Sequence, residues 1–197
     1  MFYLIIICIS AALTILNNSI STWFSARDIF LESLATIVGA ISIFLLDALI
    51  ALIIRRLTPK TWYRPECAIF KVSKNERNFY NRIAIKKWKF IVPELGCFTG
   101  FSKKHIEKTD DIEYLTRFIT ESNYGVVIHV ANALLGFLIA FIPICSHPTV
   151  WIPIYIINFV LSMLPVFILR YTSYTLYNLY QRQKKSKNAK EQNKARI

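Results

Sequence analysis

The residues with the clearest capacity for chemistry lie in one stretch, Phe118 to Phe137, which begins polar and continues into an apolar run. On a helix, its polar and small residues fall within about 80° of one another. They are Glu121, Gly125, His129, Asn132 and Gly136. An imidazole with a carboxylate nearby can act as a general base, because the carboxylate orients one ring nitrogen and leaves the other to remove a proton. This pair predicts acyl transfer to an alcohol, with His129 as the base and Glu121 as its orienting group.

Asp47 is a second candidate to orient the histidine. It lies with Glu32 in the apolar run Ile29 to Ile54, eight residues before Arg55 and therefore about 12 Å along a helix from that arginine. Both carboxylates share a helix face with small residues (Thr36, Gly39, Ala40), although Ile43 interrupts that face before Asp47. Small residues alone indicate close helix packing, whereas two carboxylates in an apolar run indicate a function or a specific polar partner.

The elements that must position these residues are membrane helices. The chain has 197 residues, is 54% hydrophobic and has a mean hydropathy of +0.40, which is too apolar for an ordinary soluble domain.

Four spans are expected: Phe2 to Leu16, extending as far as Phe24, then Ile29 to Ile54, Tyr124 to Ile142 and Val150 to Leu169. The first lacks a basic leader and a clear cleavage site, which favours a retained anchor over a cleaved signal. The predicted fold is an all-α integral membrane protein, divided at 1–54, 55–123, 124–169 and 170–197.

Charge predicts how these spans are oriented. Lys and Arg number 24 against 12 Asp and Glu, a net charge of +12. Residues 55–123 carry 15 of the cations and residues 170–197 carry 8, whereas residues 17–28 carry one and residues 143–149 none. Because cytoplasmic loops are enriched in Lys and Arg, both termini and the central segment are expected in the cytoplasm of a cell-membrane protein. The cations adjoin apolar runs, so membrane lipids are the expected partner and nucleic acid is not.

The central segment is predicted to contain one amphipathic helix lying in the membrane interface. One half of the run 78–92 is apolar: Phe79, Tyr80, Ile83, Ala84, Trp88, Phe90 and Ile91. Arg82, Lys86 and Lys89 occupy the other half, while Lys87 and Ile85 break the pattern. Such a helix sinks its apolar face to the acyl boundary; a solvated helix packed on protein is the alternative. These cations (Arg82, Lys86, Lys87, Lys89) could bind the phosphates of an acyl donor, acyl-CoA or an acyl-carrier protein.

The end of the last span is predicted to carry an aromatic belt of Tyr171, Tyr174, Tyr177 and Tyr180, followed by a disordered basic tail from Gln181. Arg170 is expected to act as a membrane anchor or a headgroup ligand.

Other motifs are weaker. The spacing His105-x4-Asp110 is the one used by glycerolipid acyltransferases, but the further sequence blocks of those enzymes do not follow it. His147 is a loop histidine with no expected role. The four cysteines form no CxxC pair, which predicts neither a disulfide framework nor a metal site.

Three blocks carry a family resemblance. They are Asn81-Arg-Ile-Ala-Ile-Lys-Lys-Trp88-Lys89 with Pro93-Glu94-Leu95-Gly96; Tyr114-Leu115, Phe118-Ile119 and Glu121 with His129; and Leu164-Pro165, Arg170-Tyr171 and Leu176. With these blocks the chain resembles the glycosyl-4,4'-diaponeurosporenoate acyltransferase family, which completes staphyloxanthin-type carotenoids. It departs from the family pattern at Val126, Leu169, Thr172 and Ser173.

The resemblance implies transfer of a fatty acyl group to a sugar hydroxyl of a membrane-embedded isoprenoid glycoside. The family positions it implies are Trp88, Lys89, Glu121, His129, Arg170 and Tyr171. Two other functions stay open: a non-catalytic membrane subunit that binds another membrane protein, and a lipid-binding or transport protein.

Overall fold

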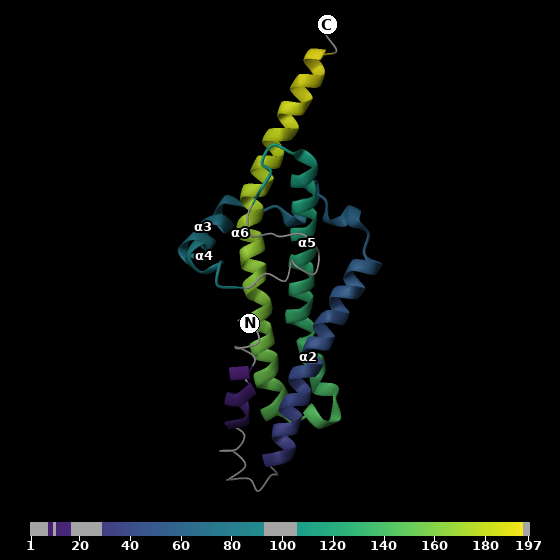
Figure 1. Cartoon of the computed structure of the whole chain (residues 1–197), viewed down its shortest axis with the longest axis vertical. Coiled ribbons are helices and arrows are strands. Elements are labelled where there is room, and N and C mark those ends of the chain that lie inside the picture. Colours follow the sequence, from purple (N-terminus) through teal and green to yellow (C-terminus); the bar gives the residue numbers. More distant parts are fainter. Residues whose placement is uncertain (1–7, 10, 17–28, 93–105, 195–197) are drawn as a thin grey trace. The chain divides into compact units, whose positions relative to one another are not determined.

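The computed structural model of the protein describes residues 8–9, 11–16, 29–92 and 106–194, and the regular structure of these residues is helical, without a strand (Figure 1). Four α-helices carry most of the described chain beyond residue 28: α2 (Ile29–Leu57), α3 (Lys74–Arg82), α5 (Ile112–Leu135) and α6 (Pro148–Lys194). The short elements between them are η1 (Lys60–Tyr63), η2 (Ala68–Phe70), α4 (Ile85–Trp88), η4 (Gly136–Phe141) and η5 (Pro143–Cys145).

Three of the described helices are long and apolar enough to cross a membrane: Phe30–Leu57, Ile112–Phe141 and Pro148–Asn193. They coincide to within one residue with all of the second, third and fourth predicted spans and extend beyond them, which confirms the all-helical class and its apolar helices. The first predicted span lies largely outside the described residues, although residues 11–16 are helical.

The last helix is much longer than predicted. Its 47 residues extend about 70 Å, whereas the hydrocarbon core of a bilayer is about 30 Å thick. The prediction of a disordered tail from Gln181 is therefore wrong as far as Lys194. Residues 181–194 are rich in Lys and Gln and contain neither Gly nor Pro, so nothing interrupts the helix that precedes them.

Helix starts follow their capping residues. Ser73 Oγ accepts from the Glu76 N–H at 3.1 Å, which begins α3. Asp111 Oδ1 accepts from the N–H groups of Glu113 and Tyr114, which begins α5. At the start of α6, Pro148 follows His147, whose Nδ1 accepts from the Thr149 N–H at 3.3 Å. His147 therefore has a structural role as a helix cap.

The chain forms two compact units. Unit 1 contains Met1–Arg56 and Ile128–Leu164, and unit 2 contains Leu57–Val127 and Pro165–Ile197, so that α5 and α6 contribute residues to both. The core of unit 1 is apolar: Ala35, Ile43, Ile139, Cys145, Val150 and Ile154. One core cluster of unit 2 is formed by Leu115, Phe118, Ile119, Leu176, Tyr177 and Tyr180.

Two glycines of unit 1 lie where helices approach closely. A Cβ added to Gly39 would lie 2.6 Å from Ile154 Cδ1, and one added to Gly136 would lie 2.7 Å from Asn158 Nδ2. On the same face of α2 as Gly39, Glu32 is 8% exposed and its Oε1 accepts from Thr149 Oγ1 at 3.4 Å. The small-residue face of α2 therefore packs on protein, and Glu32 has the specific polar partner that its position indicated.

The outer surface of unit 1 is apolar. Phe30 is 72% exposed and Leu45 67% exposed, and large apolar side chains are exposed along the length of α2. A helix that is apolar on all sides and buries one face is typical of a membrane span.

Candidate functional site

The predicted amphipathic helix is two short helices. α3 ends at Arg82, Ala84 takes a left-handed conformation (φ 53°, ψ 38°), and α4 covers Ile85–Trp88. The prediction of one continuous interfacial helix is therefore wrong, because a left-handed residue interrupts the helical hydrogen bonding. The turn directs Tyr80 and Ile85, which are 4% and 0% exposed, into a cluster with Tyr171.

Glu76 of α3 is the centre of a hydrogen-bonded cluster in unit 2. Its Oε1 accepts from Arg170 Nε at 2.5 Å and from the Tyr80 hydroxyl at 2.7 Å, and its Oε2 accepts from Arg170 Nη2 at 2.9 Å. The Ser73 backbone N–H also donates to this carboxylate. The hydrogen bonds from Arg170 hold the pKa of Glu76 below its usual range. Burial, with a smaller contribution from the Glu76 carboxylate, raises the pKa of Tyr80 to about 12.

Arg77, next to Glu76, makes a second contact with α6. Its Nη1 donates to the Tyr171 carbonyl, and its guanidinium lies 3.6 Å from the centroid of the Tyr171 ring. A cation over an aromatic face is attracted by the negative face of the ring. Arg77 and Glu76 therefore attach α3 to α6 through adjacent residues, Arg170 and Tyr171.

Arg170 and Tyr171, two of the positions implied by the family resemblance and candidates for substrate binding, are thus partners of α3. The contacts of Glu76 and Arg77 with α6 were missed by the sequence reasoning, and Tyr80 was predicted only as part of an apolar helix face. The spacing Ser73-x-x-Glu76 is that of a helix capping box, and it could have predicted where α3 begins. Their partners on α6 lie about 94 residues away in the chain, and no local pattern indicates such a pairing.

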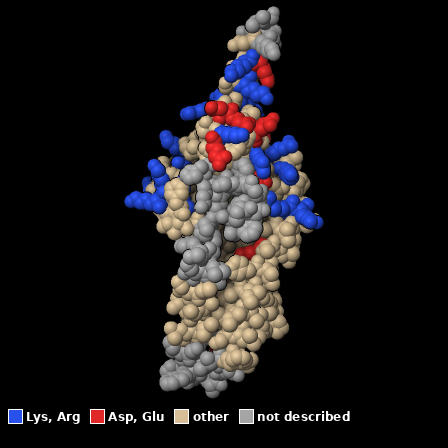
Figure 2. Space-filling view, in the orientation of Figure 1, with Lys and Arg blue, Asp and Glu red and all other residues tan. Residues whose placement is uncertain are grey.

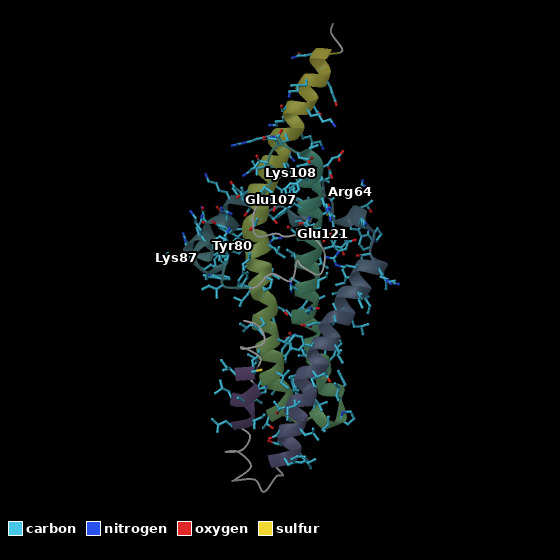
Figure 3. The ribbon with its side chains drawn as sticks, in the orientation of Figure 1. Arg64, Tyr80, Lys87, Glu107, Lys108 and Glu121 are labelled. Carbon is cyan, nitrogen blue, oxygen red and sulfur yellow. The ribbon has the colours of Figure 1, made fainter. Side chains whose placement is uncertain are left out.

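The cations predicted to bind the acyl donor lie on the outer side of α3 and α4. Arg82, Lys86 and Lys87 are exposed and Lys89 is half-buried. In Figure 3, Lys87 projects away from α6 and Tyr80 lies nearer to it. Figure 2 shows Lys and Arg gathered in the regions of α3, α4 and the end of α6. Cations at these positions are accessible to an anionic partner.

Trp88, the remaining predicted donor-binding residue, is half-buried and packs against the Tyr80–Ile85–Tyr171 cluster. Its indole N–H donates to the Ile83 carbonyl at 3.0 Å, which satisfies an acceptor at the turn between α3 and α4. In this position the indole stabilises the turn.

The predicted aromatic belt is wrong for three of its four tyrosines. Tyr171, Tyr177 and Tyr180 are 8%, 8% and 5% exposed because they pack inside unit 2. The Tyr180 hydroxyl donates to Glu66 Oε1 at 2.6 Å, and the Tyr177 hydroxyl accepts from Asn123 Nδ2 at 3.5 Å. A repeat every third residue turns around a helix, so the rings lie on different sides of α6: Tyr171 packs with Tyr80 and Ile85, and Tyr177 and Tyr180 pack with residues of α5.

The predicted catalytic residues divide between the two units. Glu121 belongs to unit 2 and is half-buried on α5 (Figure 3). Two and three residues later on the same helix, Asn123 Nδ2 donates to the Tyr63 carbonyl at 2.9 Å and the Tyr124 hydroxyl donates to the Thr58 carbonyl at 3.2 Å. These bonds fix η1 against α5 near Glu121.

His129 and Asp47 both belong to unit 1, on α5 and α2, and both are half-buried. One turn beyond His129, Asn132 accepts at its backbone carbonyl from Asn158 Nδ2 at 3.3 Å. Asn158 of α6 is also hydrogen-bonded through its side chain to Asp47. Unit 1 therefore contains a polar group to which each long helix contributes: the Asp47 and Asn158 side chains and the backbone carbonyl of Asn132, one turn beyond His129. His129 is half-buried, and the Asp47 carboxylate and the Asn158 amide add polar contacts to the same unit.

Only part of the competing His105-x4-Asp110 motif lies within the residues that the structure describes. His105 lies outside the described residues, and Asp110 Oδ1 accepts from Gln183 Nε2 at 3.2 Å. Glu107 and Lys108 belong to the same loop (Figure 3). Since Asp111 caps α5, this loop leads directly into that helix.

Comparison with known proteins gives one match. The model of the family described as glycosyl-4,4'-diaponeurosporenoate acyltransferase matches residues 59–186, which is more than half of the chain. No curated protein and no solved structure matches the chain. The matched range contains Trp88, Lys89, Glu121, His129 and Arg170, and it excludes α2 with Asp47.

Proposed function

We propose that this chain, which belongs to the glycosyl-4,4'-diaponeurosporenoate acyltransferase family, transfers a fatty acyl group to a sugar hydroxyl of a membrane-embedded carotenoid glycoside. The observation that carries the proposal is the family match over residues 59–186, together with the half-buried His129 inside that range. The three apolar helices are compatible with a substrate held in the membrane.

In the proposed reaction, His129 removes the proton from the acceptor hydroxyl as its oxygen attacks the carbonyl carbon of an acyl thioester. The carbon–sulfur bond breaks, and the imidazolium returns the proton to the leaving thiolate, so that histidine ends neutral. Asp47, which belongs to the same unit as His129, would stabilise the charged imidazole.

The acyl donor is proposed to be acyl-CoA or an acyl-carrier protein. Both bear phosphate, and the outer side of α3 and α4 presents Arg82, Lys86, Lys87 and Lys89 without an acidic residue among residues 78–92. Because the charge distribution favours cytoplasmic termini, the reaction is assigned to the cytoplasmic side of the cell membrane.

Replacement of His129 tests the proposal. Membranes containing the wild-type chain should convert a glycosyl carotenoid ester and a fatty acyl donor into the acylated glycoside. His129→Ala should lose product at least 100-fold, which is the usual contribution of a general base. His147→Ala is a matched control in the same unit, because its ring caps α6 and is not assigned to the reaction.

Full activity in a folded His129→Ala variant would contradict the assignment of the base. No transfer by the wild-type chain with any supplied donor would contradict the enzymatic function itself, and would favour a non-catalytic subunit or a lipid-binding protein.

A further inference from the structure

The polar group of unit 1 has unmatched hydrogen-bonding capacity. Asn132 and Asn158 are 5% and 7% exposed. Of the two hydrogens on Asn158 Nδ2, one goes to the Asn132 carbonyl and the other is available to Asp47. Two buried oxygens, Asp47 Oδ1 and Asn132 Oδ1, accept no hydrogen bond within the described chain. A buried acceptor without a donor is costly, and more so in an apolar surrounding.

The arrangement depends on Gly136. Asn158 Nδ2 lies 2.7 Å from where a Cβ of Gly136 would be, so the amide reaches the α5 backbone only because residue 136 has no side chain. The close approach places Asn158 between α5 and α2, where it contacts both Asn132 and Asp47. The unmatched acceptors thus belong to a group built by three helices.

The two oxygens specify the chemistry of a ligand. Both are acceptors, so the complementary group is a hydrogen-bond donor. A carboxylate repels anions, and residues 128–164 contain no Lys or Arg, which excludes the phosphate of an acyl donor. A divalent metal requires more ligands than these, and the described residues contain no group of three His, Cys, Asp or Glu. A neutral hydroxyl satisfies the acceptors without adding charge.

Asp47 is the most accessible member of the group. It is half-buried, whereas the two asparagines form a buried interior side. Both unmatched oxygens are covered in this structure, so a hydroxyl would reach them only as the side chains around Asp47 move. Phe44, one turn before Asp47 on α2, is apolar and 48% exposed, so the apolar chain of a ligand can lie beside the group.

We propose that Asp47, Asn132 and Asn158 form a binding site for the sugar hydroxyls of the glycoside acceptor. This inference rests on the proposed function for the identity of the acceptor. Its physical content, recognition of hydroxyl donors by acceptors inside unit 1, is independent of the acyl transfer.

The test measures binding without an acyl donor. The tagged full chain is immobilised in detergent and titrated with the glucosyl ester of 4,4'-diaponeurosporenoic acid, whose visible absorbance reports the amount retained. The methyl ester of the same acid is the comparison probe, because it keeps the polyene and lacks the sugar hydroxyls. Asn132→Leu is the main variant, since leucine keeps the volume and removes the unmatched oxygen. Ser162→Ala is the control, a buried polar residue of unit 1 on α6.

Asn132→Leu should bind the glucosyl ester at least about tenfold more weakly, bind the methyl ester unchanged, and unfold at or above the wild-type temperature. Unchanged stability matters because a merely structural asparagine would destabilise the protein when replaced. If Asn132→Leu does not fold, Asp47→Asn serves instead, with at least about threefold weaker binding expected because a neutral acceptor forms a weaker hydrogen bond.

Equal binding of the glucosyl ester by wild type and by the folded variant would overturn the site. An equal loss of binding for the two esters would also overturn it, because the residues would then shape an apolar surface without forming hydrogen bonds to the sugar hydroxyls. Absence of acyl transfer by the wild type, with the difference between the esters preserved, would refute the proposed function and leave the site standing.

Discussion

The hydrogen-bonded attachment of α3 to α6 gives the sharpest prediction about stability. Arg170→Met removes both guanidinium bonds to Glu76 and keeps the unbranched stem of the side chain. The two side chains are 21% and 25% exposed, so the pair is neither a surface nor a fully buried ion pair. Exposed pairs contribute about 0–1 kcal/mol, and breaking a fully buried pair costs about 3–5 kcal/mol. A loss of about 2 kcal/mol is therefore expected, or about 4–8 °C in unfolding temperature for a chain of this size.

A double-mutant cycle measures the interaction itself. Wild type, Glu76→Gln, Arg170→Met and the double variant are unfolded in the same detergent, and their unfolding temperatures are compared. The double variant should be destabilised by at least about 1 kcal/mol less than the sum of the single variants, because either change alone breaks the same pair. Additive effects, within about 0.5 kcal/mol, would refute the reasoning that this contact holds α3 in place.

The attachment also has a pH dependence with a fixed sign. The pKa of Glu76 is lower in the folded protein than the ordinary value of 4.5. Its contribution to stability is therefore fully present above that ordinary value and is lost as the pH falls through the lower, folded pKa. The difference in unfolding temperature between wild type and Glu76→Gln should be constant from pH 6 to 8 and shrink under acid. A difference that grows under acid would contradict the sign.

The remaining predictions concern single contacts. Gly136→Ala should destabilise the protein by about 1–3 kcal/mol, since its Cβ would lie 2.7 Å from Asn158 Nδ2, and unchanged unfolding would show that Asn158 can move without cost. Tyr80→Phe should cost about 1–2 kcal/mol by removing the hydroxyl donor to Glu76. Because the pKa of Tyr80 is raised to about 12, that cost should be fully present below pH 10 and fade as the pH rises through 12; unfolding curves of the two proteins that stay parallel to pH 12 would contradict this.

The apolar helices were predictable because burial in a membrane requires long continuous apolar runs, and such runs are local in the sequence. α2 begins at its predicted first residue, Ile29, and ends at Leu57, three residues after its predicted last residue. α5 begins after its capping Asp111. The break at Ala84 was not predictable, because alanine is the best helix former and nothing in its neighbourhood signals a left-handed residue. Packing of Tyr80 and Ile85 against Tyr171 compensates for that conformation.

The tyrosines of α6 show the same limit. Their spacing and their position after an apolar run are typical of an aromatic belt, and a sequence cannot distinguish a ring at the membrane surface from one that faces another helix. These tyrosines face protein because residues from other parts of the chain contact them: Glu66, Asn123 and Arg77.

By itself, the sequence determined the helical class, three apolar helices, the excess of cations outside the apolar runs and the family, because each depends on composition or on residues close together in the chain. The tertiary structure alone decided which polar residues meet. It paired Glu76 with Arg170 across about 94 residues and joined Asp47, Asn132 and Asn158 from three helices. The physical reason is that a polar group in an apolar surrounding is stabilised by whichever partner the packing of helices brings within hydrogen-bond distance, and close packing at Gly39 and Gly136 sets that approach.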